Sequence, residues 1–161
     1  MKILVVSGFL GAGKTTFIRT LAERTKKDFA VMENEYGAVN VDGDLLEQTN
    51  DLNIWELTEG CICCSMQNDF ATSILTIANT VDPEYLIVEP TGVGMLSKII
   101  ENIQKIEYER ITLLEPLTIL DGTMYDRCMF EFSEICEDQI QSAGRILVSK
   151  MEYAADRKSV V

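Results

Sequence analysis

The amino-terminal segment constrains the fold of this chain more than any other part of it. A short apolar run, Ile3–Val6, leads into Gly8-Phe-Leu-Gly11-Ala12-Gly13-Lys14-Thr15-Thr16, and the residues that follow favour a helix. This fits the pattern G-x-x-x-x-G-K-[ST] in the order strand, loop, helix. Glycines let backbone N–H groups turn inward around phosphate oxygens, and the positive end of the helix faces the same anion. The sequence therefore predicts a phosphate-binding loop, or P-loop.

Each residue type in this loop has an expected role. Lys14 should reach the terminal phosphates of a nucleotide, and Thr15 should offer its hydroxyl to Mg²⁺. The remaining nucleotide-binding positions are expected at Gly8, Gly11, Ala12, Gly13 and Thr16. The competing interpretation is a glycine-rich turn that contains Lys-Thr by chance. The spacing does not match the G-x-G-x-x-G pattern of dinucleotide-binding folds.

A carboxylate at the end of a second apolar run supports the P-loop interpretation. Glu89 follows Leu86–Val88 and precedes Pro-Thr-Gly92. An acid in this position lies beside a P-loop and can hold Mg²⁺, usually through water. We therefore group Glu89 with Lys14 and Thr15 as catalytic residues, the alternative being a polar residue that merely ends a strand. Asp121 has a similar position with weaker support.

Short apolar runs alternate with amphipathic stretches along the chain. Strands are predicted at Ile3–Val6, Phe29–Met32, Ile54–Leu57, Tyr85–Val88, Leu117–Leu120 and Ile146–Val148. Helices are predicted at Thr15–Thr25, Gln67–Thr80, Leu96–Ile106 and Ser133–Ala143. This alternation indicates an α/β fold, with a mainly parallel sheet flanked by helices. We expect a single P-loop domain over residues 1–161.

Charge and hydropathy narrow the function classes. The net charge is −12, from 14 basic and 26 acidic side chains, which disfavours nucleic-acid and anionic membrane partners. No apolar stretch approaches the ~20 residues of a membrane span. The first residues imitate a signal peptide, but they run into the P-loop without a cleavage site. We expect a cytoplasmic protein.

Three of the five cysteines, Cys61, Cys63 and Cys64, lie within four positions, and the chain has no histidine. Thiolates are soft ligands that suit Zn²⁺ and related ions. A redox thiol group and a buried apolar cluster remain alternatives. The odd number of cysteines argues against a disulfide scaffold. Cys128 and Cys136 are expected to pack in the core.

Several segments together resemble the CobW-like family of P-loop GTPases, which includes zinc and cobalt metallochaperones. Beyond the P-loop they are Glu33-Asn-Glu-Tyr-Gly37, Gly60-Cys-Ile-Cys-Cys-Ser65, Glu89-Pro-Thr-Gly92, and Asp138-Gln-Ile through Ile146-Leu-Val-Ser-Lys150. The resemblance covers nearly the whole chain. The Glu-Asn-Glu-Tyr-Gly element followed by Cys-x-Cys-Cys is much more specific than the P-loop alone.

The resemblance implies a Mg²⁺-dependent GTPase that binds GTP and GDP, with switch segments coupled to a transition-metal site. On this pattern, Cys61, Cys63 and Cys64 are the metal motif for Zn²⁺ or Co²⁺. Glu33 is the matching oxygen ligand, since a carboxylate can complete a three-thiolate site.

The chain departs from the family pattern at the base-reading motif, which is commonly Asn-Lys-x-Asp. Here the residues are Ser149-Lys150-Met151-Glu152. We expect the Glu152 carboxylate to accept the guanine N–H groups and the Lys150 stem to lie along the base. Ser149 is shorter than Asn, and Ala38 replaces an acid that relatives often carry. Relatives also usually have a C-terminal domain, so we expect either a minimal family member or a chain that lacks a tail present in the cell.

The sequence thus predicts a GTP-hydrolysing protein that delivers metal or a metallocofactor to a client metalloprotein or cofactor-dependent enzyme. No residue is an obvious water-activating base, so turnover should be slow unless a partner or a nucleotide-dependent homodimer accelerates it. The alternatives are a nucleotide- and metal-responsive regulatory module with little turnover, and an ATP-using P-loop kinase.

Overall fold

The computed structural model describes residues 1–25, 27, 29–34, 52–56 and 67–154. Their centre is a seven-stranded sheet with the order β3-β2-β4-β1-β6-β7, in which β5 pairs with β1 ahead of β6. All the strand pairs of this sheet within the described residues are parallel. The predicted α/β fold with a mainly parallel sheet is confirmed.

The strands are β1 Lys2–Gly8, β2 Phe29–Asn34, β3 Leu52–Glu56, β4 Tyr85–Pro90, β5 Thr112–Leu113, β6 Leu117–Asp121 and β7 Arg145–Ser149. The helices are α1 Lys14–Thr25, α3 Gln67–Thr80, α4 Leu96–Gln104, α5 Tyr125–Glu131, α6 Ser133–Gln141 and α7 Met151–Ala154. Each predicted strand and helix is present, and none of their ends moves by more than two residues. The prediction missed β5, α5 and α7, which are too short to show a clear period.

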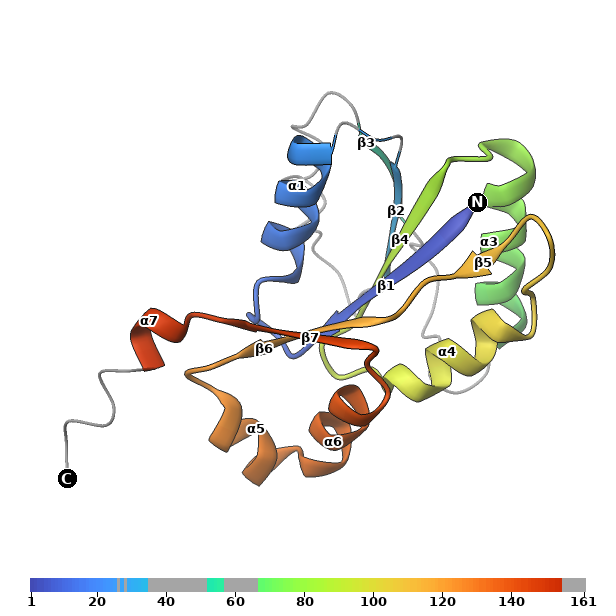
Figure 1. Cartoon of the computed structure of the whole chain (residues 1–161). Helices are drawn as coiled ribbons and strands as arrows, with labels where there is room; N and C mark the ends of the chain where they lie inside the picture. The colour runs from blue at the N-terminus through green and yellow to red at the C-terminus, as the bar shows by residue number, and fades with distance from the viewer. Residues whose placement is uncertain (26, 28, 35–51, 57–66, 155–161) are drawn as a thin grey trace, which may run out of the picture.

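Helices cover the two faces of the sheet unequally (Figure 1). On one face α1 packs through Phe17, Ile18 and Leu21, which recur at helical spacing, against strand residues such as Val31 and Ile87. On the other face α3 and α4 cover a core that includes Ile74 and Ile103. Figure 1 shows α6 beside α4, with α5 next to it. The sheet is therefore the middle of three layers.

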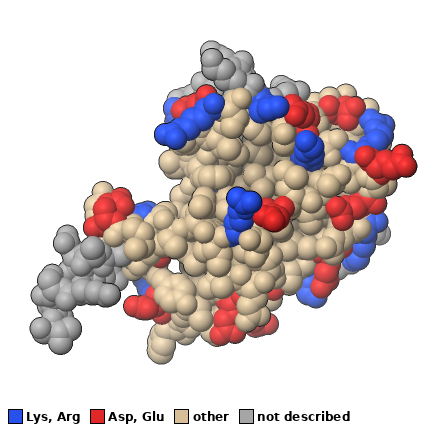
Figure 2. All heavy atoms as spheres, viewed as in Figure 1, with Lys and Arg blue, Asp and Glu red and all other residues tan. Residues whose placement is uncertain are grey.

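The strand β7 forms one edge of the sheet and leaves apolar side chains exposed. Ile146, Leu147 and Val148 are each more than two-fifths exposed. On the face seen in Figure 2, acidic and basic side chains are interspersed around a wide uncharged area over β6 and β7. Within the described residues, no helix has the length and apolar character needed to cross a membrane.

We predict that Ile18→Ala lowers the free energy of unfolding by about 2–5 kcal/mol, because Ile18 is fully buried between α1 and the sheet. Urea unfolding followed by circular dichroism measures this change. The matched control is Ile146→Ala on the exposed edge strand, which should cost less than about 1 kcal/mol. Equal costs for the two variants would contradict the assignment of α1 to the core.

Candidate functional site

The loop between β1 and α1 has the backbone that its glycines predict. Gly8, Gly11 and Gly13 have φ angles of 146°, 74° and 99°, in the region that side chains rarely allow. Gly8 also lies against β6, since a Cβ placed there would be 2.4 Å from the carbonyl oxygen of Ile119. The first residue of the loop therefore lies directly beside Ile119 of the neighbouring strand β6, and α1 begins directly after the loop at Lys14.

The three residues predicted to be catalytic lie together at the carboxyl end of the sheet. Lys14 and Glu89 are buried, and the Lys14 ammonium is 3.7 Å from Oε1 of Glu89. The Thr15 hydroxyl is 3.3 and 3.4 Å from the two carboxylate oxygens of Glu89. These residues line a pocket of about 510 Å³, together with loop glycines and Gly92. We call this the phosphate pocket.

A second pocket of about 470 Å³ adjoins the phosphate pocket and shares Gly13, Thr16 and Thr20 with it. Its walls are mostly apolar and are completed by Ser149 and Lys150. The apolar wall residues are Ala12, Phe17, Ile119, Leu147 and Val148. An apolar pocket beside a glycine-rich P-loop has the character that a nucleobase would require. We call this the base-side pocket.

Of the predicted base-binding residues, Ser149 and Lys150 hold the P-loop. The Ser149 hydroxyl donates to the carbonyl oxygen of Ala12 at 2.7 Å, and the Lys150 ammonium donates to that of Gly11 at 2.8 Å. The structure thus joins the end of β7 to the loop after β1. Glu152 lies exposed on α7 and lines neither pocket.

The carboxylate of Asp121 connects Lys150 to the end of β6. It accepts a hydrogen bond from the Lys150 ammonium at 2.7 Å, and two more from the backbone and side chain of Thr123. Burial alone would raise the pKa of Asp121, but these hydrogen bonds and the Lys150 charge outweigh it and hold the pKa below 3.8. Thr123 was not predicted from the sequence, although the spacing Asp-x-Thr is typical of a turn in which the aspartate side chain accepts a hydrogen bond from the backbone two residues later.

Glu33 lies inside a strand, which corrects the prediction that it follows one. It is buried near the end of β2, in register with Glu89 of β4. Glu33 is two residues after Val31, which packs against α1, so Glu33 lies on the α1 face of the sheet. Residues in register share a face, so Glu89 lies on that face as well. The Glu33 carboxylate, predicted to bind the transition metal, and the Glu89 carboxylate, predicted to bind Mg²⁺, therefore both lie near the carboxyl ends of neighbouring strands.

The predicted thiolate cluster, Cys61, Cys63 and Cys64, lies outside the described residues, as does Ala38. Within the described part of the chain, no group of three or more Cys, Asp or Glu side chains is arranged to hold a metal ion. The three-thiolate site thus stays a prediction.

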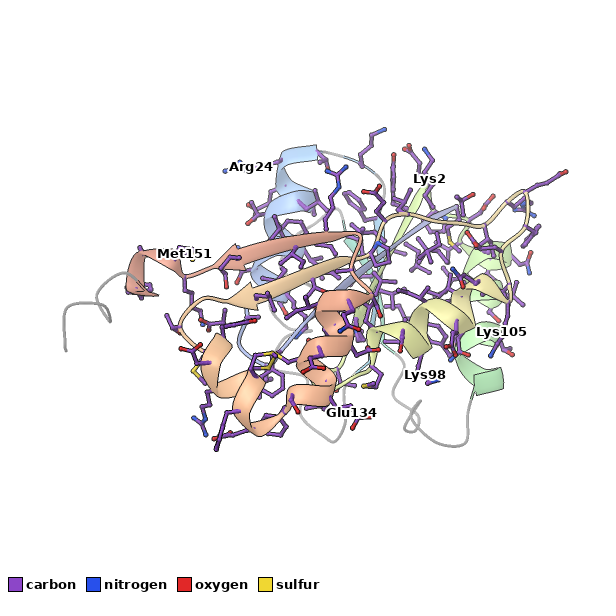
Figure 3. The ribbon with its side chains drawn as sticks, turned by 60° about the horizontal axis from the view of Figure 1, so that its bottom comes forward. Lys2, Arg24, Lys98, Lys105, Glu134 and Met151 are labelled. Carbon is purple, nitrogen blue, oxygen red and sulfur yellow. A yellow bond between two sulfur atoms is a disulfide. The ribbon has the colours of Figure 1, made fainter. Side chains whose placement is uncertain are left out.

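Cys128 and Cys136 are buried, as predicted, but they are also joined as a disulfide, which the sequence did not lead us to expect. The bond links α5 to α6 beside the sheet (Figure 3). The two cysteines are eight residues apart, and the bend between the two helices at Phe132 brings them together. The ring of Phe132 in turn packs on Phe9 of the P-loop, with centroids 5.0 Å apart.

Comparison with known proteins assigns the family. The model of the CobW/HypB/UreG nucleotide-binding domain matches residues 2–161. This chain belongs to the CobW/HypB/UreG family. It is 32% identical to the zinc chaperone YjiA of Escherichia coli over 98% of this chain and 52% of that protein. It is 38% identical to the zinc chaperone CobW of Sinorhizobium over 92% and 50% of the two chains.

Solved structures agree on the fold of this family member. The Zn(II)-bound YjiA GTPase from E. coli superposes with a TM-score of 0.68 at 24% identity, over 99% of this chain and 52% of that one. The hydrogenase maturation factor HypB from Archaeoglobus fulgidus gives a TM-score of 0.66 at 15% identity, over 97% and 69% of the two chains. The chain spans about half the length of the relatives that it matches in sequence.

We predict that Asp121→Asn lowers the free energy of unfolding at neutral pH by about 1 kcal/mol, a modest value because Lys150 is partly exposed. The folded state depresses the pKa of Asp121, so its contribution is complete above the ordinary value of 3.8. The contribution is lost as the pH falls through the lower, folded-state pKa. The difference between wild type and variant should therefore vanish in strong acid.

Urea unfolding at neutral and acid pH measures this difference. The control is Asp126→Asn, which alters an exposed aspartate and should change stability by less than about 0.5 kcal/mol. A wild-type advantage that is the same at every pH would contradict an ionised Asp121 as its source.

Proposed function

We propose that this chain is the nucleotide-binding unit of a Mg²⁺-dependent GTPase that delivers a transition metal, zinc or cobalt, to a client metalloprotein. The observation that carries the proposal is the group of Lys14, Thr15 and Glu89 beside the glycine loop, in which Lys14 and Glu89 are buried and Thr15 is half-buried. Family membership supports it, because relatives include zinc chaperones and a GTPase.

The phosphate pocket has the charge that a nucleotide's phosphates require. The positive φ angles of Gly11 and Gly13 belong to a loop whose N–H groups can surround oxygens, and α1 adds its positive end. The ammonium of Lys14 stands in the same buried place, where charges act more strongly than in water. Lys14 is then positioned to stabilise negative charge on the transferred phosphoryl group.

The donor set also suits Mg²⁺. A hydroxyl and a carboxylate within 3.4 Å of each other, from Thr15 and Glu89, are oxygen ligands of the kind this ion prefers. Mg²⁺ would compensate phosphate charge, with Thr15 binding it directly and Glu89 through water. Glu89 would then exchange its present contact with the Thr15 hydroxyl for one to the hydrated ion.

The base-side pocket is proposed to take guanine. Lys150 closes the pocket with its stem, while its ammonium is held by Gly11 and Asp121. We propose that Glu152 accepts the guanine N–H groups, which requires α7 to bring it to the pocket. The Ser149 hydroxyl is committed to the P-loop, so its part in the site is to hold the loop.

The transferred metal is proposed to bind Cys61, Cys63, Cys64 and Glu33. Glu33 and Glu89 are in register on neighbouring strands, so the metal site and the nucleotide site would both lie at the carboxyl ends of these strands. A change of charge at one site would then change the electrostatic energy of an ion bound at the other, because the two sites would be close together and partly buried. This arrangement supports nucleotide-dependent metal affinity and release to a client.

We predict that Lys14→Ala weakens GTP binding at least about 10²-fold, because one buried ammonium faces several phosphate oxygens. Titration calorimetry with Mg²⁺ and GTP, followed by a phosphate-release assay, measures binding and turnover. The matched control is Lys98→Ala on α4, an exposed lysine that should leave both unchanged (Figure 3).

The same two assays test the preference for guanine over adenine and whether the bound nucleotide is hydrolysed. Competition with ATP should fail to displace GTP at equal concentration. Tighter ATP binding would instead favour the kinase alternative, and GTP binding without phosphate release would favour a regulatory module. Unchanged GTP affinity in Lys14→Ala would refute the site.

We predict that Zn²⁺ affinity differs at least about 5-fold between the GDP-bound and GTP-analogue-bound forms. By thermodynamic linkage, Zn²⁺ must change the relative affinity for the two nucleotides by the same factor. Competition with a chromophoric chelator measures Zn²⁺ affinity in both nucleotide states. Replacing Cys61, Cys63 and Cys64 with Ser should abolish the difference and preserve GDP binding. Equal Zn²⁺ affinities in the wild type would refute the coupling.

A further inference from the structure

The α6 residue Gln139 is a fully buried polar side chain that none of the proposed nucleotide or metal contacts uses. Its Nε2 donates hydrogen bonds to the carbonyl oxygens of Gly92 at 3.2 Å and Gly94 at 3.0 Å. These two glycines belong to the turn over residues 91–94, which connects β4 to α4 directly after Glu89-Pro90. A side chain from a distant part of the sequence therefore holds this turn.

The surroundings determine which way the amide of Gln139 faces. Two carbonyl oxygens require a donor, so Nε2 must face the turn and Oε1 must face away from it. Within the described residues, Oε1 is buried and accepts no hydrogen bond. A buried acceptor without a donor costs stability, and an apolar side chain of the same length would avoid that cost. The donated bonds to the turn are what the glutamine uniquely supplies.

The backbone that carries Gln139 is firmly anchored. The Thr118 hydroxyl of β6 donates to the carbonyl oxygen of Gln139 at 2.7 Å. The Ser97 N–H of α4 donates to the carboxylate of Asp138 at 3.1 Å. The disulfide from Cys136 ties the same helix to α5. Gln139 thus reaches the turn from a fixed support.

The turn itself lies against the P-loop at the phosphate end of the site. A Cβ added to Gly92 would come within 2.6 Å of the backbone nitrogen of Leu10. Gly92 and Leu10 both line the phosphate pocket, and neither lines the base-side pocket. The Gly94 N–H donates to the Thr91 carbonyl at 2.9 Å, which closes the turn. A shift of the turn would therefore alter the wall near the phosphates and leave the base-side pocket as it is.

We propose that Gln139 is a positioning residue that holds the 91–94 turn against the phosphate pocket and so lets the protein distinguish nucleoside triphosphate from diphosphate. This inference rests on the proposed nucleotide-binding function. A turn held in place offers its backbone to the end of the phosphate chain without an entropic cost on binding. Without Gln139, the turn must be ordered when the triphosphate binds, whereas base and α-phosphate contacts are unaffected.

The test compares Gln139→Met, which keeps the length and removes the donor, with Gln139→Glu, which places an acceptor against two carbonyls. Calorimetry gives the affinities for GDP and for a non-hydrolysable GTP analogue in the presence of Mg²⁺. We expect Gln139→Met to weaken the analogue at least about 5-fold and to change GDP affinity less than about 2-fold. Gln139→Glu should act in the same direction. Thermal unfolding should show that the Met variant still folds, since it removes one buried acceptor without a donor but also removes the donor of two turn carbonyls.

The matched control is Gln141→Glu, which alters an exposed glutamine on the same helix and should leave both affinities unchanged. Equal weakening of both nucleotides in Gln139→Met, or no weakening, overturns the positioning role. A wild-type protein that binds neither nucleotide overturns the proposed function, and this inference with it, before any Gln139 variant is made.

A measurement on the wild type covers the case in which the variants do not fold. Amide hydrogen exchange over residues 91–97 should be slow without nucleotide, because the turn is already held. It should become slower with the GTP analogue than with GDP. Rapid exchange without nucleotide, or equal protection by the two nucleotides, contradicts a turn held ready for the triphosphate.

Discussion

The close contact between the first glycine of the P-loop and strand β6 is the constraint on which the rest of the structure depends. Gly8 has no room for a side chain because the Ile119 carbonyl lies against it. The backbone must turn there, and α1 begins at Lys14 with its ammonium beside Glu89. A buried ammonium is stable only with compensating negative charge. Glu89 supplies part of it here, and phosphates would supply more.

Contacts from distant parts of the chain converge on this turn. Ser149 and Lys150 hold the P-loop from β7, and Phe132 packs on Phe9 from the bend between α5 and α6. Gln139 holds the neighbouring turn after β4 from α6. Residues after position 130 thus support both the P-loop and the turn after β4. These contacts meet at the proposed nucleotide site, and holding a loop in place in this way is what a preorganised electrostatic site requires.

The sheet also determines how the proposed nucleotide and metal sites could influence each other. The carboxyl ends of parallel strands lie on the same side of the sheet. Glu33 of β2 and Glu89 of β4 are therefore neighbours in register, although they are 56 positions apart in the sequence. If the cysteines bind metal beside Glu33, the transferred metal and the phosphates are close enough for their charges to interact. A GTPase that releases metal on hydrolysis needs such an arrangement, in which the charge of the phosphates changes the affinity for the metal.

The sequence by itself determined the order of strands and helices, the parallel sheet and the P-loop, because these follow from local periodicity and from glycine's access to positive φ. It also predicted that Glu89 would lie beside the P-loop residues Lys14 and Thr15, since the carboxyl ends of parallel strands lie on the same side of the sheet. Only the tertiary structure placed Glu33 within β2, joined Cys128 to Cys136, and gave Ser149 and Gln139 their carbonyl partners. These contacts join residues far apart in the chain or across a bend. Local pattern carries no information about which backbone carbonyl a hydroxyl or amide will meet once the layers pack.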